Sequence, residues 1–170
     1  FRNLMAMEVE ESIRAHPLDA VVLLASCDKT TPGQLMGAIS ANVPAIMLTG
    51  GPSDPAMCFG RELGVGTDLW KYTDDLRAGR MAREDYDQLE TALIPSSGHC
   101  NEMGTASTMA ILVEAMGMSL SGSAVTPATD PRRGEQAFAT GARAVAMALE
   151  GLRPSDLRAP GRHHGPAMCA

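Results

Sequence analysis

The sequence predicts an α/β protein in which a parallel sheet is flanked by helices. Two short apolar runs, 19–25 (DAVVLLA) and 43–49 (VPAIMLT), have the composition of strands that are buried on both faces. Helical patterns precede, separate and follow these runs, and the alternation of helix and strand is typical of a parallel layer. A chain of 170 residues is also long enough to bury a sizeable core as one domain.

The first half of the chain supplies both predicted strands. Residues 1–15 predict a helix that the pair His16-Pro17 ends, because proline cannot continue the hydrogen-bond ladder. A second helix is expected from Thr31, as the N-cap, and Pro32, in the first helical position, to about residue 41. After the second strand, residues 50–67 contain several glycines and prolines, which predict a long irregular stretch.

The second half of the chain is mainly helical. Charged helices are expected around 69–78 and 83–93, and further helices at 105–116 and 131–151. The last of these has apolar or small residues at steps of three and four, which predict its buried face: Phe138, Gly141, Ala142, Val145, Ala148, Leu149 and Leu152. From residue 158 the pattern stops, so residues 1–157 are assigned to the domain and 158–170 to a flexible tail.

Charge and cysteine content exclude several classes of protein. A formal net charge of -6 argues against a broad nucleic-acid or anionic-membrane surface, and no apolar run approaches the length of a membrane span. No leader pattern opens the chain, so nothing marks it for secretion. The four cysteines contain no C-x-x-C pair, so free thiols or metal ligands are expected rather than a zinc ribbon or disulfides. A chain that opens at Phe1, within a helical pattern, is expected to be a piece of a longer protein.

The stretch SCDKTTPG places a thiol, a carboxylate and an amine side by side directly after the first strand. Cys27, Asp28 and Lys29 could form an ordinary turn with a packed thiol and two solvated charges. They could also form one wall of a site, because ligands of open parallel sheets bind beyond the carboxyl ends of the strands. The following helix N-terminus would favour a thiolate at Cys27, and Asp28 would suit Mg²⁺. Lys29 has no evident partner as a cation.

Cys100 lies in a similar position, in a loop of small residues before a helix. Taken alone it could be a packed thiol, but two thiols in two pre-helical loops favour a shared metal site, since thiolates suit iron–sulfur centres and zinc. The neighbouring His99 could be a ligand, a base or neither. There is no phosphate-binding glycine motif and no serine-hydrolase elbow.

Four longer motifs resemble the dihydroxy-acid and phosphogluconate dehydratase family: LLASCDKTTPGQLMGA, PAIMLTGGP, GTDLWKY and GHCNEMGTASTMAILVEAMGMSLSGSAVTPA. The likeness covers residues 1–157. Within the family, CDKTTP together with CNxMGTAST is most similar to the sugar-acid (aldonate) dehydratases that act on arabinonate or xylonate. The chain therefore resembles part of the N-terminal, cluster-binding domain of such an enzyme.

The resemblance implies a site and its cofactors. Cys27 and Cys100 match two of the three cysteines that hold a 2Fe-2S cluster, and Asp28 and Lys29 match ligands of an adjacent Mg²⁺. Lys29 would be carbamylated, and it is the residue of this chain to which the resemblance gives a catalytic role. A carbamylated lysine is a carboxylate, which would explain a lysine that has no partner as a cation.

The implied reaction removes water from a 2,3-dihydroxy acid and gives a 2-keto-3-deoxy acid, with a small-molecule sugar acid as substrate. The third cysteine, further Mg²⁺ ligands and the base would lie outside these residues, so the 170-residue chain alone is expected to be inactive. Two alternatives stay open: a dihydroxy-acid dehydratase of branched-chain amino-acid synthesis, and a non-catalytic iron–sulfur redox module. The resemblance also implies a cytoplasmic protein, which fits the missing leader pattern, and a homo-oligomer, a dimer or tetramer.

Overall fold

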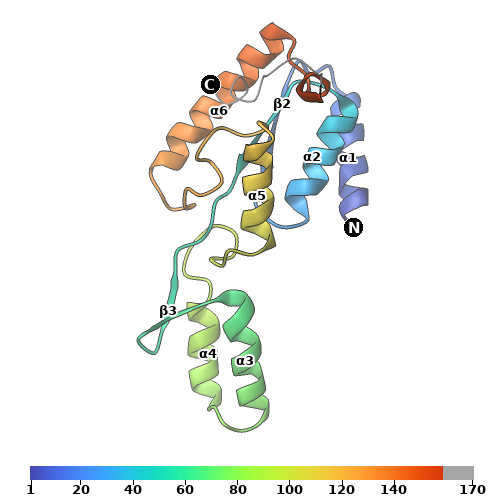
Figure 1. The fold of residues 1–170 in the computed structure, drawn as a ribbon. Coiled ribbons are helices and arrows are strands. Elements are labelled where there is room, and N and C mark those ends of the chain that lie inside the picture. The colour runs from blue at the N-terminus through green and yellow to red at the C-terminus, as the bar shows by residue number, and fades with distance from the viewer. Residues whose placement is uncertain (159–170) are drawn as a thin grey trace.

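The computed structural model describes residues 1–158 and has the α/β architecture that the sequence predicts (Figure 1). The predicted tail, apart from its first residue, lies outside the described residues. The elements are α1 (Arg2–Arg14), β1 (Val21–Ala25), α2 (Thr30–Ala41), β2 (Ala45–Thr49), β3 (Ala56–Cys58), β4 (Arg61–Leu63), α3 (Val65–Arg77), α4 (Arg83–Ala92), α5 (Thr105–Ala115), α6 (Arg132–Glu150) and the 3₁₀ helix η1 (Pro154–Arg158).

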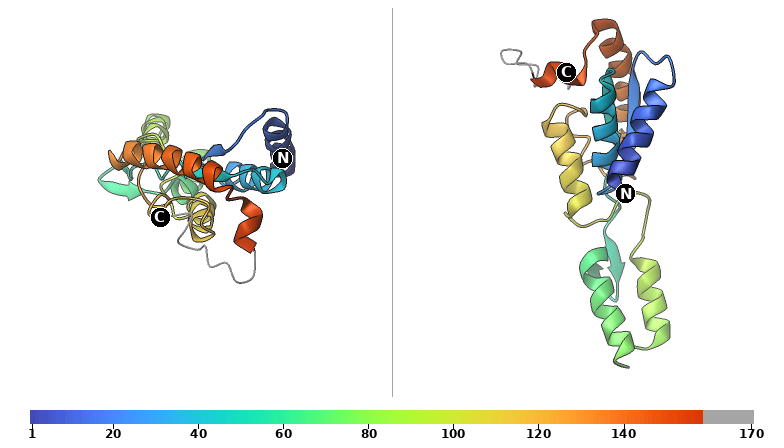
Figure 2. Two further views of the ribbon diagram at one scale, coloured as in Figure 1. Left: turned by 90° about the horizontal axis from the view of Figure 1, so that it is seen from above. Right: turned by 90° about the vertical axis from the view of Figure 1, so that its right-hand side faces the viewer.

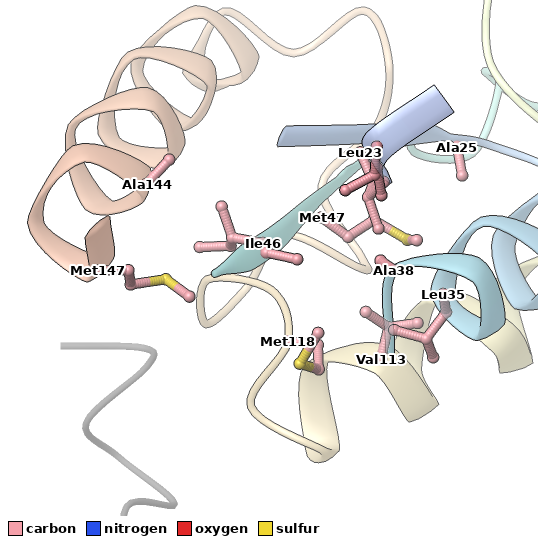
Figure 3. Close-up of a cluster of buried hydrophobic side chains, with 12 residues drawn as sticks. Leu23, Ala25, Leu35, Ala38, Ile46, Met47, Val113, Met118, Ala144 and Met147 are labelled. Carbon is pink, nitrogen blue, oxygen red and sulfur yellow. The ribbon is translucent and has the colours of Figure 1, made fainter. Parts of the chain in front are cut away.

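The main lobe is built on the parallel pair of β1 and β2. The strands pair without offset, from Val21 opposite Ala45 to Ala25 opposite Thr49. Helix α6 covers one face of the pair, and α1, α2 and α5 lie on the other (Figures 1 and 3). Because the two strands end at the same level, the loops that follow them leave the sheet together.

Alternate residues of β2 build the core on the two faces of the sheet. Ile46 points toward Ala144 and Met147 of α6, whereas Met47 lies on the side of Ala38 in α2 (Figure 3). Both β2 side chains are fully buried. This burial on both faces confirms the prediction for residues 43–49. The same prediction for residues 19–25 was wrong in part, because the side chains of Val22 and Leu24 in β1 are exposed.

A second, smaller lobe contains β3, β4, α3 and α4 and extends away from the sheet (Figures 1 and 2). It has its own apolar cluster, which includes Leu63, Tyr72, Tyr86 and Leu89. The prediction that residues 50–67 are irregular was wrong in part, because β3 and β4 form an antiparallel hairpin there and α3 already begins at Val65. The hairpin turns at Phe59 and Gly60, both with positive φ, and strands of three residues are too short to give a periodic signal.

The buried face of α6 also differs from the prediction. Its buried residues are Thr140, Ala144 and Met147, while Phe138, Val145 and Leu149 of the expected face are exposed. The hydroxyl of Thr140 donates to the carbonyl of Gln136 within the same helix, so a polar residue can be buried there without an unpaired group. Much of the stripe that the sequence marks as apolar is therefore left uncovered by residues 1–158, while Gly141, Ala148 and Leu152 are half-buried.

The core assignment predicts different costs for two strand methionines. Met47→Ala should lower the free energy of unfolding by about 2–5 kcal/mol, because it removes a fully buried side chain and leaves a cavity. The matched control Met57→Ala, in β3 and 58% exposed, should change it by less than about 0.5 kcal/mol. Urea unfolding of the two variants measures both values, and equal losses would contradict the assignment.

Candidate active site

The turn from β1 to α2 holds three of the predicted site residues together. The backbone N–H of Cys27 donates to the Thr30 hydroxyl at 3.0 Å, and the Thr31 N–H donates to the Cys27 carbonyl at 3.1 Å. These bonds fix a tight turn that leaves the Cys27 thiol exposed. The thiol sulfur lies 3.6 Å from Oδ1 of Asp28.

Asp28 and Lys29 form an ion pair in this turn. The hydrogen bond from the Lys29 ammonium is the main reason why the pKa of the Asp28 carboxyl lies below its usual value, and desolvation opposes the shift only partly. Asp28 is therefore a carboxylate at neutral pH, which is the form that binds a hard cation. With Lys29 as an ammonium, the pair leaves little net charge for a metal ion.

The start of α2 differs from the prediction by two residues. The N-cap is Lys29 rather than Thr31, and Thr31 lies inside the first turn with its side chain buried. The reason is that Thr30, not Thr31, directs its hydroxyl back to Cys27. Pro32 is consequently the third helical residue, where its missing N–H still costs no intrahelical bond.

The loop that carries Cys100 is fixed to the segment after β2. Pro52 and His99 form a parallel bridge, in which the His99 N–H donates to Gly51 at 2.9 Å and the Ser53 N–H donates to His99 at 2.8 Å. Gly98 has φ +123°, and a Cβ atom there would lie 2.5 Å from the backbone nitrogen of Ser53. Only glycine fits this approach.

The residues after Cys100 hold the loop from the other side. Asn101 donates its amide to the carbonyl of Leu63 at 3.1 Å. The carboxylate of Glu102 accepts hydrogen bonds from the backbone of Gly66 at 2.7 Å and from the hydroxyl of Thr67 at 2.8 Å. These contacts tie Cys100 to the first turn of α3, where a negative charge is favourable.

Both thiol-bearing loops thus meet the same backbone segment at the carboxyl end of the sheet. The Gly50 N–H donates to Ala25 at 2.9 Å, two residues before Cys27, and Gly51 accepts from His99 beside Cys100. Within residues 1–158 no hydrogen bond or ion pair joins Cys100 to Cys27, and no group of three His, Cys, Asp or Glu side chains could hold a metal ion. Cys100 is half-buried.

His99, which the sequence leaves open as ligand, base or neither, is a buried residue of this loop. Its Nδ1 lies 3.0 Å from the carbonyl oxygen of Cys100, and its Nε2 is buried without a hydrogen-bond partner among the described residues. The imidazole therefore supports the backbone at Cys100. Its role as ligand or base stays untested.

Arg133 is a site-forming residue that the sequence analysis missed. Its guanidinium donates to the carbonyls of Thr49 and Ser123 at 2.9 Å, and also to that of Thr126. Burial lowers the pKa of Arg133. These bonds fix the loop before α6 beside a cavity of about 600 Å³ at the carboxyl end of the sheet, which Ser26 also lines. A lone arginine near a helix start carries no sequence signal for such long-range contacts.

The sequence of the chain places this arrangement in a known family. Residues 1–160 match the family profile described as dihydroxy-acid/6-phosphogluconate dehydratase N-terminal. The chain belongs to this dehydratase family. Members of the family among its relatives are named dehydratases, so the family is enzymatic.

Three relatives show how this dehydratase domain compares. It is 48% identical to an L-arabinonate dehydratase of Rhizobium leguminosarum over 157 residues, which are 92% of this chain and 27% of the relative. It is 42% identical to a D-xylonate dehydratase of Caulobacter vibrioides, over 92% of this chain and 26% of the relative. It is 40% identical to a dihydroxy-acid dehydratase of Picrophilus torridus, over 92% and 28%.

This dehydratase-family chain spans about a quarter of the length of the curated relatives that it matches. Among residues 1–158, the structure contains no helix with the length and apolar character that a membrane span requires.

Because the backbone of Ser53 lies so close to Gly98, alanine should lower the free energy of unfolding more at Gly98 than at another glycine with positive φ. Gly98→Ala should lower the free energy of unfolding by about 2–5 kcal/mol, since backbone strain and a clash with Ser53 add. Gly60→Ala, with φ +73° and no atom near the added methyl, should cost about 1–2 kcal/mol. Chemical unfolding and the alkylation rate of Cys100 test the pair. Equal costs, with unchanged Cys100 reactivity in Gly98→Ala, would show that the loop does not depend on this contact.

Proposed function

We propose that the full-length protein to which these residues belong is a hydro-lyase that converts a sugar acid (aldonate) into a 2-keto-3-deoxy acid. In this proposal Cys27 and Cys100 hold a 2Fe-2S cluster, and Asp28 and carbamylated Lys29 hold Mg²⁺. The observation that carries it is the turn Cys27–Lys29 at the carboxyl end of the sheet, in a chain with named aldonate dehydratases among its relatives.

The side chains of the candidate site are of the chemical types that these cofactors require as ligands. Thiolates suit iron–sulfur centres, and carboxylate oxygens suit Mg²⁺. The exposed Cys27 thiol is free to bind, and Asp28 is ionised. The described residues do not complete a metal site by themselves, so the proposal takes the remaining ligands from the rest of the full-length protein.

Carbamylation would change the charge of the turn. The neutral amine of Lys29 forms a bond to the carbon of CO₂ and releases a proton, which replaces an ammonium with a carboxylate. The ion pair with Asp28 is then lost, and two anions stand next to each other. Such a pair is stable only beside a cation, which is why this modification supports a Mg²⁺ site.

When bound, the two metal centres supply Lewis-acid polarisation and orientation of the substrate hydroxyls. The part of this chain is to hold its donors in place. The hydrogen bonds of Cys27 to Thr30 and Thr31 fix the first thiol loop, and the Pro52–His99 bridge fixes the second.

The proposal predicts turnover of an aldonate. The full-length protein, purified without oxygen and supplied with Mg²⁺, should form a keto acid from L-arabinonate or D-xylonate. Cys27→Ser and Lys29→Ala should each reduce kcat by at least about 100-fold, because each removes a metal ligand. Met57→Ala, an exposed residue of the small lobe, serves as the control and should retain activity.

A dihydroxy-acid dehydratase is the second candidate, because relatives with that name are 40–41% identical to this chain. Turnover of 2,3-dihydroxyisovalerate alone would keep the reaction and replace the substrate. A cluster with reversible redox behaviour and no turnover of either class would overturn the dehydratase proposal. The 170-residue chain by itself should show no activity.

A further inference from the structure

The two outer edges of the β1–β2 pair differ in the hydrogen bonding of their backbone groups. At the outer edge of β2, the N–H of Met47 donates to the Met118 carbonyl at 2.7 Å, and the Thr49 carbonyl accepts from Arg133. The Met47 N–H and the Thr49 carbonyl on this side thus have partners within the chain, from the segment before α6 and from α6 itself. An edge that is covered in this way offers no place for another strand.

The outer edge of β1 is largely open. Val21 donates its N–H to Pro44 and Ala25 accepts from Gly50, so the backbone of the intervening alternate residues, Val22 and Leu24, faces outward. The side-chain amide of Gln34 donates to the Leu24 carbonyl at 2.9 Å. Among residues 1–158, neither Val22 nor the N–H of Leu24 has another hydrogen-bond partner at this edge.

Grooves lined mainly by apolar side chains accompany the open edge on both faces of the sheet, although Glu8, Ser12 and His16 also line the one beside α1. On one face, a cavity of about 770 Å³ lies between β1 and α6, and Val22, Val145 and Leu149 line it. On the other, a cavity of about 670 Å³ lies between β1 and α1, and Val9 and Ile13 line it. Leu24, at the edge itself, is 66% exposed.

Val145 and Leu149 of the exposed α6 stripe line the first groove. Phe138, Val145 and Leu149 are 81%, 62% and 86% exposed, although they belong to the face that the sequence predicts as buried. A helix with its apolar stripe in water, beside a strand with an open edge, is an incomplete layer. One added strand would cover both.

We propose that an apolar β-strand from the part of the full-length dehydratase outside these 170 residues pairs with β1. Its side chains would alternate between the two grooves, so those on the α6 side should be apolar and those on the α1 side mainly apolar. About three quarters of the length of the matched relatives lies outside the aligned region, which provides such a segment. This inference rests on the part of the proposed function that places the chain within a full-length dehydratase.

Amide hydrogen exchange at single-residue resolution tests the pairing in the 170-residue chain and in the full-length protein. In the 170-residue chain, the amides of Val22 and Leu24 should exchange quickly. In the full-length protein both amides should exchange at least roughly tenfold more slowly, because the added strand accepts a hydrogen bond from each of them. Val21, whose N–H already bonds to Pro44, is the internal control and should be protected in both.

Two outcomes would overturn the proposal. Fast exchange of Val22 and Leu24 in the full-length protein, with Val21 still protected, would mean that no strand pairs there. Protection that rises with the concentration of the 170-residue chain and does not increase further in the full-length protein would identify a second copy as the occupant. Neither readout depends on turnover, so a failed activity assay and a failed strand pairing remain distinguishable.

A pair of substitutions at one position gives an independent test. Leu24→Lys should lower the Tm of the full-length protein, because the added strand would bury the lysine charge. It should leave the Tm of the 170-residue chain unchanged, because Leu24 is exposed there. Leu24→Met keeps an apolar side chain and should leave both unchanged. An unaltered Tm of full-length Leu24→Lys would contradict the proposal.

Discussion

The in-register parallel pairing of β1 and β2 determines where the loops of the candidate site lie. Because Ala25 and Thr49 end their strands side by side, the two following loops leave the sheet at one edge. Parallel strands need a crossover, and α2 supplies it, so the Cys27–Lys29 turn must lie at the start of a helix. The bridge between Pro52 and His99 then brings the Cys100 loop to the same backbone. A slip of one residue would turn the core side chains of β2 to the wrong faces.

Local signals in the sequence are sufficient to predict the strands and helices of the main lobe. Continuous apolar runs with proline or glycine at their ends identify β1 and β2, and His16-Pro17 locates the end of α1. The sequence does not predict the small hairpin, because β3 and β4 have three residues each and the turn between them contains a phenylalanine with positive φ. The cap of α2 was misplaced because adjacent threonines are equivalent in sequence, and only the turn geometry selects Thr30.

The candidate site also contains contacts that the sequence predicts and contacts that it does not. Cys27, Asp28 and Lys29 are neighbours in sequence, so their contacts could be expected from the sequence alone. The anchoring of Cys100 depends on residues more than thirty positions away, such as Gly66 with Glu102, which no local pattern encodes. The α6 stripe is a different case: its amphipathic pattern predicts a buried face, yet Phe138, Val145 and Leu149 are exposed within residues 1–158. Periodicity marks the apolar side of a helix but does not say what covers it.

In the proposed function, Cys27 and Cys100 belong to one iron–sulfur centre beside a Mg²⁺ site at Asp28 and Lys29. Anomalous X-ray scattering at the iron edge, from anaerobically grown crystals of the full-length protein, tests it most directly. We expect iron bonded to the sulfur atoms of both cysteines, and a carboxylate on Nζ of Lys29. Iron bound away from either cysteine, or an unmodified Lys29 still paired with Asp28 beside the cluster, would contradict it.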